Sequence, residues 1–321
     1  MFTLIEALKA LAFGIVEGIT EWLPISSTGH MMLLQQFLPL DVSASFYDVF
    51  LVVIQLGAIM AVIILYFQKL NPFSRKKTPA QRRSTWGIWA KVVVGTIPAG
   101  IVGLLLDNWM EENVMNNDQI SYLVVSLALI VYGIIFIVME HVNRKRIAEA
   151  QAAPRGKHAA PAHAARDFKW EADPEGEDAS NAIAKVRNFD ELSFGKAFAI
   201  GIFQSLAIIP GTSRSGSIII GSMLLGTSRT VATEFAFFLA IPIMFGWSLL
   251  KFFKHGLAYT GTEWMVFGIG VVTAFVVSIL SIKFLIGYIK RNDFTAFGVY
   301  RIIVGIAMIG VFGVALGKLF M

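Results

Sequence analysis

The sequence has no cysteine among its 321 residues, and Asp, Glu, Lys and Arg together make up only 15% of it. The absence of cysteine excludes disulfide bonds, thiolate nucleophiles and sulfur-ligated metals. A soluble domain would carry roughly a quarter charged residues. Hydrophobic residues instead reach 56%, and they form blocks of about 20 residues, long enough for a helix to cross a bilayer core. The composition therefore predicts an all-α polytopic membrane protein.

The net charge of +5 comes from basic residues in the loops between these blocks. This distribution follows the positive-inside rule of membrane proteins, so we expect membrane lipid around the chain and no nucleic-acid partner. The N-terminus has neither a basic segment nor a small-residue cleavage site. We therefore expect the first apolar stretch to stay in the protein.

Six apolar blocks predict transmembrane helices at residues 46–67, 88–106, 119–140, 231–250, 264–287 and 298–320. Two further apolar segments, 4–38 and 194–226, are interrupted midway by Pro, Gly, Ser and charged residues. At membrane depth, a broken backbone is tolerated only where it is buried in protein or lines a wet cavity. We therefore expect each segment to be a re-entrant helical hairpin, which enters and leaves the membrane by the same face.

The two halves of the chain, 1–143 and 192–321, resemble each other at a spacing of 187 residues. That spacing aligns the segments 14–17 with 201–204 and 26–29 with 213–216. A hairpin plus three spans crosses the membrane an odd number of times, so the halves are expected to form an inverted-topology repeat. Inverted repeats place a substrate site near the midplane, at broken helices in matching positions.

Charge in the loops predicts the orientation of the chain. The loop 68–87 carries six Lys and Arg residues, whereas 107–118 carries only acidic charges. The positive-inside rule places the first loop in the cytoplasm and both termini outside. Residues 144–191, rich in Ala, Pro and mixed charge, have too few large apolar residues to offset the entropy of ordering, so we predict a mobile cytoplasmic linker there.

Glu17 and Glu21 lie four residues apart in the first interrupted segment, which puts them on one helical face. A carboxylate at membrane depth costs at least about 2.5–3.5 kcal/mol on insertion scales. Two adjacent like charges cost more, unless a cation or a shared proton relieves them. The pair predicts a divalent-cation site or a general acid or base. A surface helix with both acids in water is the alternative, which the surrounding apolar residues disfavour.

A run of hydroxyl side chains follows this pair. Pro24 breaks the helix, so Ser26, Ser27 and Thr28 fall at the start of the next half-helix. His30 lies three residues after Ser27, a spacing that would let its imidazole activate the Ser27 hydroxyl as a nucleophile. Helix capping is the alternative role for any one of these hydroxyl groups.

The second interrupted segment carries a counterpart. Arg214 offers a planar, permanently charged guanidinium suited to phosphoryl oxygens, and a helix start built from small residues exposes amides to an anion. A structural ion pair with a glutamate of the other hairpin is the alternative for Arg214. Gln204 matches Glu17 in the repeat and is expected to line the cavity. The predicted phosphate-binding residues are Ser26, Thr28, Gly211, Thr212, Ser213, Ser215 and Gly216.

Four other polar side chains lie in or at the edge of predicted spans, and the sequence leaves each open between a site group and a structural partner. They are Asp48, Gln55, Glu234 and Arg301.

These motifs resemble the undecaprenyl-diphosphate phosphatases of the bacitracin-resistance family. The resemblance rests on Glu17 and Glu21 with the segments 24–30 and 210–216, and it covers nearly the whole chain apart from 144–191. One position departs from the pattern, because the second motif usually ends in Thr where this chain has Ile218. The linker is also longer than is usual in that family.

The resemblance implies hydrolysis of undecaprenyl diphosphate to undecaprenyl phosphate and inorganic phosphate, at the periplasmic face of the bacterial inner membrane. This reaction would recycle the lipid carrier for cell-wall synthesis and confer bacitracin resistance, since bacitracin competes by binding the substrate. The implied catalytic residues are Glu17, Glu21, Ser27, His30 and Arg214, with Glu17 and Glu21 holding a divalent cation, Mg²⁺ or Ca²⁺.

Three alternatives stay open at this stage. The nucleophile is Ser27, His30 or water, and the oligomeric state is undetermined, with a homodimer among the options. A transporter or flippase for an anionic or lipid-phosphate substrate is the alternative from another class, because inverted repeats with broken helices are a common transporter plan.

Overall fold

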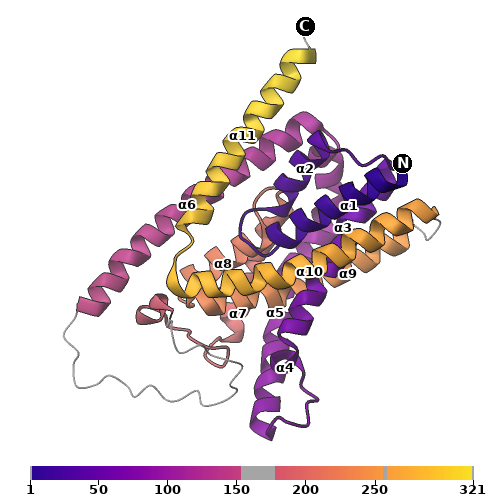
Figure 1. The fold of residues 1–321 in the computed structure, drawn as a ribbon. Helices are drawn as coiled ribbons and strands as arrows, with labels where there is room; N and C mark the ends of the chain where they lie inside the picture. Colours follow the sequence, from indigo (N-terminus) through magenta and orange to yellow (C-terminus); the bar gives the residue numbers. More distant parts are fainter. Residues whose placement is uncertain (1, 153–177, 256–258, 320–321) are drawn as a thin grey trace.

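The computed structural model describes residues 2–152, 178–255 and 259–319, and within these ranges the chain is almost entirely helical (Figure 1). The α-helices are α1 Phe2–Thr20, α2 Ser27–Phe37, α3 Ala44–Leu65, α4 Phe67–Leu70, α5 Pro79–Met110, α6 Asp118–Ala152, α7 Phe194–Ser205, α8 Arg214–Leu224, α9 Arg229–His255, α10 Gly261–Arg291 and α11 Thr295–Leu319. Over the described residues, β structure is limited to one isolated bridge, between Val186 and Thr227. The predicted all-α fold class is confirmed.

Six of these helices are long and apolar enough to cross a membrane, namely α3, α5, α6, α9, α10 and α11. The chain is therefore a multi-pass membrane protein. Some helices extend beyond the apolar blocks of the sequence. Helix α5 begins at Pro79 because Thr78 and Gln81 form a capping box there, and it continues into a π-helical turn, Glu111–Met115.

Both interrupted segments break in the same way. Helices α2 and α8 each have 11 residues, and each is preceded by a serine in the left-handed region, Ser26 with φ 71° and Ser213 with φ 69°. Among the described residues, these two are the only non-glycine residues with positive φ. Left-handed backbone is unfavourable for serine and persists only where the surrounding structure imposes it. The breaks thus match in conformation at the spacing of 187 residues.

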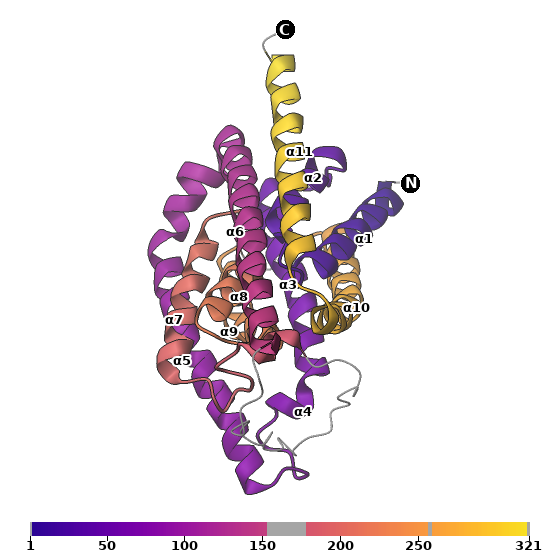
Figure 2. The ribbon, with the colours of Figure 1, turned by 90° about the vertical axis from the view of Figure 1, so that its left-hand side faces the viewer.

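Each broken segment packs against a span from the other half of the chain. Helix α1 lies along α10, α7 lies along α5, and α6 lies along α11 (Figures 1 and 2). Glycines allow the close approach, because a Cβ at Gly14 would lie 2.7 Å from the Gly270 carbonyl oxygen and one at Gly201 would lie 2.2 Å from that of Gly95. The packing therefore brings helices from both halves of the chain into contact around each break.

The prediction of a mobile linker over 144–191 is wrong at both ends. Helix α6 continues to Ala152, and the segment from Asp178 onward packs against the protein, with Val186 and Phe189 buried. The average composition of the segment conceals these few anchoring residues. Its middle part, 153–177, lies outside the described residues.

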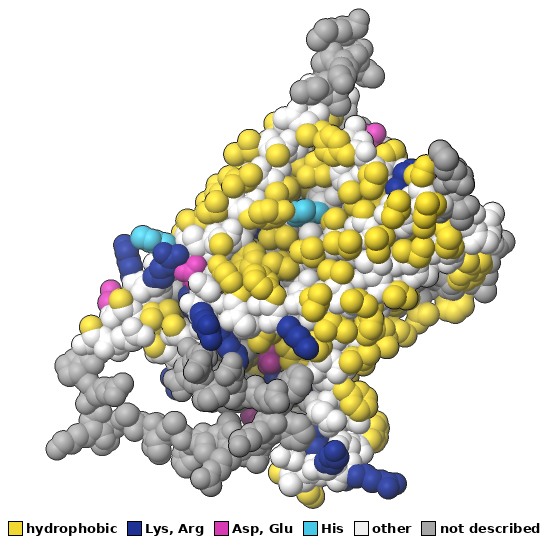
Figure 3. All heavy atoms as spheres, viewed as in Figure 1, with side chains coloured by type: hydrophobic (Ala, Val, Ile, Leu, Met, Phe, Trp, Pro, Cys, Tyr) yellow, Lys and Arg dark blue, Asp and Glu magenta, His cyan; other side chains and the backbone are white. Residues whose placement is uncertain are grey.

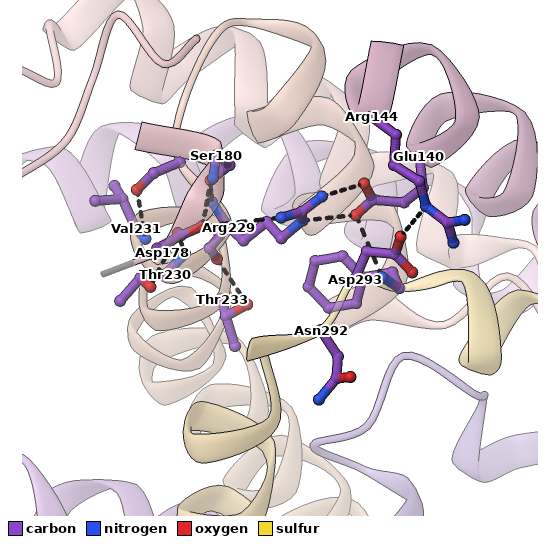
Figure 4. A network of polar contacts seen from close by, with 12 residues as sticks. Glu140, Arg144, Asp178, Ser180, Arg229, Thr230, Val231, Thr233, Asn292 and Asp293 are labelled. Carbon is purple, nitrogen blue, oxygen red and sulfur yellow. Dashed lines mark hydrogen bonds and ion pairs between the residues drawn. The ribbon is translucent and has the colours of Figure 1, made fainter. Parts of the chain in front are cut away.

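A buried network of polar contacts holds this region (Figure 4). The Arg229 guanidinium donates to both carboxylate oxygens of Glu140, at 2.9 and 2.6 Å, and Glu140 also accepts from the Phe294 backbone N–H at 3.2 Å. The Asp178 carboxylate accepts from the Thr230 backbone N–H at 2.9 Å, at the start of α9. The network therefore joins α6, α9, the start of α11 and the segment that leads into α7.

Replacing Glu140 with alanine is expected to destabilise the protein by about 3–5 kcal/mol, because it leaves the buried Arg229 charge without its partner. The measurement is the midpoint of thermal unfolding in detergent. Arg144→Ala is the control, since this exposed arginine forms the neighbouring ion pair with Asp293 and should shift the midpoint far less. Equal shifts in the two variants would contradict the importance of the buried pair.

The surface separates an apolar region from a basic one. In Figure 3, hydrophobic side chains cover most of the face over α1, α10 and α11, whereas most Lys and Arg side chains lie in the lower half of the view. Figures 1 and 2 place α4 at this lower end, and place the start of α1 and the end of α11 toward the opposite end. The basic end and the termini therefore lie at opposite ends of the molecule.

Candidate active site

The two breaks meet in space. The Arg214 guanidinium at the start of α8 donates to Oε1 of Glu21 at 2.9 Å, and both side chains are largely buried. The Ser215 hydroxyl also donates to the Glu21 backbone carbonyl at 3.4 Å. Residues that are 193 positions apart thus form one cluster, at the junction of the two halves.

Glu21 also contacts Ser27, so it connects the two motifs. The Ser27 hydroxyl donates to Oε2 of Glu21 at 2.7 Å, while Oε1 of the same carboxylate receives Arg214. A hydroxyl hydrogen-bonded to a carboxylate is the arrangement in which a base activates a weak nucleophile. Ser27 is only partly buried, so the geometry brings a candidate nucleophile, base and guanidinium together.

His30 does not make the predicted contact with Ser27. Its Nδ1 lies 2.7 Å from the Ser26 carbonyl oxygen, and its Nε2 lies 2.8 Å from the Tyr300 hydroxyl. The carbonyl can only accept, so Nδ1 carries a proton and, in the neutral imidazole, Nε2 accepts from Tyr300. The ring turns back to the carbonyl four residues earlier. This correction leaves Glu21 as the group that receives the Ser27 hydroxyl.

Glu17 lies one turn before Glu21 and has an unsatisfied oxygen. The Glu21 backbone N–H donates to the Glu17 carbonyl at 3.0 Å, so the helical turn continues to Glu21 and keeps both carboxylates on one face. Glu17 is 2% exposed, and its Oε1 has no hydrogen-bond partner among the described residues. An unpartnered buried carboxylate is expensive, and a bound cation is one way to stabilise it.

Glu17 and Glu21 are the residues that would hold a divalent cation here, with the remaining ligands coming from outside the protein. The described residues contain no cluster of three or more His, Asp or Glu side chains able to bind a metal by themselves. Mg²⁺ is commonly bound through one or two carboxylates, with phosphate oxygens and water completing the shell, whereas Ca²⁺ takes six to eight oxygens. The pair Glu17 and Glu21 therefore matches the way Mg²⁺ is held better than a complete protein site for Ca²⁺.

The second break is shaped by a glycine and a serine. Gly211 has φ +93°, and a Cβ there would lie 2.6 Å from the Val125 carbonyl oxygen, so only glycine fits. The Ser213 hydroxyl accepts from the Gly216 backbone N–H at 3.1 Å and lies 3.1 Å from the Ser215 hydroxyl. The side chain of Ser213 thus caps α8.

The other predicted phosphate-binding residues differ in their surroundings. The buried Thr212 hydroxyl donates to the carbonyl of Ile209 at 2.8 Å, so it holds the turn and is not free to donate to a phosphate. The side chain of Ser26, in contrast, makes no capping hydrogen bond to α2. Thr28 is only partly buried in the first turn of that helix. Helix starts without a side-chain cap have amides available for an anion.

Gln204 lies one turn before its break, as Glu17 does before its own. It is 2% exposed, and neither its amide nitrogen nor its amide oxygen has a hydrogen-bond partner among the described residues. Its role in lining a cavity stays a prediction, and no hydrogen bond joins it to Glu21, Ser27 or Arg214.

Two residues of α11 join the cluster: Tyr300, which the sequence did not single out, and Arg301, which it left open between a site group and a structural partner. Tyr300 contacts His30, and Arg301 contacts backbone carbonyls of both breaks. An arginine inside an apolar span was the only signal of this in the sequence. Glu234, left open by the sequence, forms an ion pair with Lys69 of α4 and is a structural partner.

Comparisons with known proteins agree with this arrangement. A sequence profile described as bacitracin resistance protein BacA matches residues 10–307. An undecaprenyl-diphosphatase of Lactiplantibacillus plantarum is 48% identical over 312 residues, which cover 96% of this chain and 98% of the relative. Undecaprenyl-diphosphatase 1 of Clostridioides difficile is 45% identical, with 97% and 98% covered. One from Desulfitobacterium hafniense is 48% identical, with 95% and 96% covered. The chain belongs to the BacA family of bacitracin resistance proteins.

Proposed function

We propose that the protein is a membrane phosphatase that hydrolyses undecaprenyl diphosphate to undecaprenyl phosphate and inorganic phosphate. The contact of Glu21 with both Ser27 and Arg214 carries the proposal, because it joins a hydroxyl, a carboxylate and a guanidinium from both breaks. The relatives named undecaprenyl-diphosphatase support the same activity. Recycling of the lipid carrier for cell-wall synthesis and resistance to bacitracin, which binds the substrate, follow from it.

In this proposal the diphosphate head lies between the two breaks. The first-turn amides of α2 and the Arg214 guanidinium bind phosphoryl oxygens, with Ser26 and Thr28 alongside. Glu17 and Glu21 hold a divalent cation, Mg²⁺ by the fit of two carboxylates plus phosphate oxygens. When bound, such a cation neutralises charge on the transferring phosphoryl group.

Glu21 is the group placed to accept the Ser27 proton. In the structure its Oε1 is paired with Arg214, while its Oε2 receives the Ser27 hydroxyl. When Arg214 turns its donors to the phosphate, Glu21 loses that partner while keeping Ser27. The carboxylate then accepts the Ser27 proton as the oxygen attacks.

The reaction proceeds in two displacements. The Ser27 oxygen bonds to the terminal phosphorus, the bond from that phosphorus to the bridging oxygen breaks, and undecaprenyl phosphate leaves. Water then attacks the phosphoserine, the bond between phosphorus and the Ser27 oxygen breaks, and Glu21 returns its proton to that oxygen. The protons of the water leave on inorganic phosphate, and Ser27 is restored. Arg214 stabilises the charge that develops in both steps. His30, held by Ser26 and Tyr300, orients the break, and attack by water without a phosphoserine is the alternative within this class.

The proposed location is the bacterial inner membrane, with the site open to the periplasmic side and both termini outside. The separation of the basic end from the termini supports this orientation (Figures 1 to 3). The matched breaks, together with the packing of α1 against α10 and of α7 against α5, support two inverted repeats with re-entrant hairpins.

Removal of the cation tests the proposal directly. Purified protein in detergent is expected to release phosphate from a polyprenyl diphosphate in the presence of Mg²⁺, to stop on addition of a chelator, and to recover when Mg²⁺ is restored. A transporter or flippase would release none. Glu17→Gln should raise the Mg²⁺ concentration needed for half-maximal activity by at least about tenfold, since loss of a ligand or of its support commonly costs 10–100-fold in metal affinity. An unchanged Mg²⁺ dependence in this variant would place the cation elsewhere.

A further inference from the structure

Arg301 is a buried cation without a counter-charge. It lies in α11 and is 0% exposed, and no carboxylate among the described residues lies within ion-pair distance of it. Burying a permanent charge without an acid is unfavourable unless hydrogen bonds and nearby charge stabilise it. Among the described residues, the other buried arginine is Arg229, and it has Glu140 as its ion-pair partner. Arg301 therefore serves a purpose other than a structural ion pair.

The guanidinium of Arg301 donates hydrogen bonds to backbone carbonyls of both breaks. Nη1 donates to the Pro24 carbonyl at 3.1 Å, and Nη2 donates to the carbonyls of Gly211 and Thr212 at 2.8 and 2.9 Å. The remaining contact, from Nε to the Leu129 carbonyl, is long at 3.5 Å. Pro24 precedes the left-handed Ser26 by two positions, and Thr212 directly precedes Ser213. One side chain thus connects the backbone just before both half-helices.

The Arg301 guanidinium lies between the first turn of α8 and the ring of Tyr132. A Cβ at Gly216, in the first turn of α8, would lie 3.4 Å from Nη1. On another side, the ring of Tyr132 lies 5.3 Å from the guanidinium carbon, a cation–π distance. The preceding residue, Tyr300, gives α11 a second connection to the first break. Its hydroxyl hydrogen-bonds to His30, and the His30 ring hydrogen-bonds to the Ser26 carbonyl. One turn of α11 therefore contacts both halves of the site.

We propose that Arg301 is a positioning residue that sets the spacing between the two breaks, so that Ser27 from one and Arg214 from the other reach the same phosphoryl group. Its uncompensated charge adds to the positive potential that the diphosphate meets there. The inference rests on the proposed phosphatase function. It predicts that the flat, forked guanidinium is needed, because a lysine ammonium has all its donors on one nitrogen and cannot reach both segments as Nη1 and Nη2 do.

The test compares the same substitution at two buried arginines. Arg301→Lys and Arg229→Lys are purified in detergent, their folded fractions are measured by thermal unfolding, and kcat and KM are determined with a polyprenyl diphosphate at saturating Mg²⁺. We expect Arg301→Lys to lose about 10²-fold in kcat per folded molecule, as for a misplacement of about 1 Å, with a smaller change in KM. Arg229→Lys should be less stable but keep its kcat per folded molecule.

Equal kcat in the two lysine variants would overturn the inference. If Arg301→Lys does not fold, Tyr132→Leu and Tyr132→Phe replace it, because the first removes the ring beside the guanidinium and the second keeps it. We then expect a lower kcat in the leucine variant alone, and equal values would again overturn the inference. A wild-type protein that releases no phosphate would refute the proposed function itself, a result that is seen before any variant is compared.

Discussion

Replacing Arg214 with alanine is expected to lower the rate of phosphate release by about 10³–10⁵-fold, the range that arginine donors contribute in other phosphoryl-transfer enzymes. The guanidinium lies 2.9 Å from Glu21 and is the cationic side chain that contacts this carboxylate. Its removal takes away both the stabilisation of the transferring phosphoryl group and the ion-pair partner of Glu21. The measurement is kcat of purified protein with a polyprenyl diphosphate and Mg²⁺.

Arg144→Ala is a suitable control, because this arginine pairs with Asp293 in the network near the end of α6, away from the two breaks. It should keep the wild-type rate. Arg214→Lys should fall between wild type and alanine, since an ammonium retains charge but not the forked geometry. Activity of Arg214→Ala within tenfold of wild type would show that the phosphate binds somewhere else.

Replacing Ser27 with alanine is expected to lower kcat by at least about 10³-fold, closer to the loss of a nucleophile than to that of one hydrogen bond. The reason is the contact of 2.7 Å between its hydroxyl and Oε2 of Glu21, which pairs the attacking oxygen with a base. The wild-type enzyme, quenched in acid during turnover, should also carry a phosphate on Ser27 that mass spectrometry of its peptides can detect.

Ser248→Ala provides the matched control, because Ser248 is a buried serine of α9 whose hydroxyl donates to the Val52 carbonyl. Its activity should be unchanged. A Ser27→Ala enzyme that keeps a tenth or more of the wild-type rate, with no phosphopeptide in the wild type, would mean that water attacks phosphorus directly. In that case Glu21 activates the water and Ser27 only binds.

The sequence predicted those features that depend on local pattern. The length of the apolar blocks gave the six spans, and the paired motifs at a spacing of 187 residues located both breaks and brought Glu21 and Arg214 into one site. Such features follow from composition and helical periodicity, and the cost of charges at membrane depth required that the two motifs meet.

Features that depend on side-chain direction or on distant contacts could not be predicted. The spacing of Ser27 and His30 makes them neighbours on a helix, but it does not say that the His30 ring turns back toward the Ser26 carbonyl. Arg301 contacts Pro24, which is 277 positions away, and no local pattern carries that information. The ends of the linker were missed because one buried residue, such as Asp178, does not change an average composition.

The matched breaks also explain why the two halves cannot be alike. Ser27 and Arg214 are each the first residue of an 11-residue helix after a left-handed serine, so they are equivalent positions with different side chains. An assembly of two identical halves would present either two hydroxyls or two guanidinium groups there. With two hydroxyls it would lack the group that stabilises charge on the phosphoryl group, and with two guanidinium groups it would lack the attacking oxygen. Gene duplication can supply this symmetric framework. The reaction, however, requires different side chains at the two equivalent positions, and only divergence of the two copies provides them.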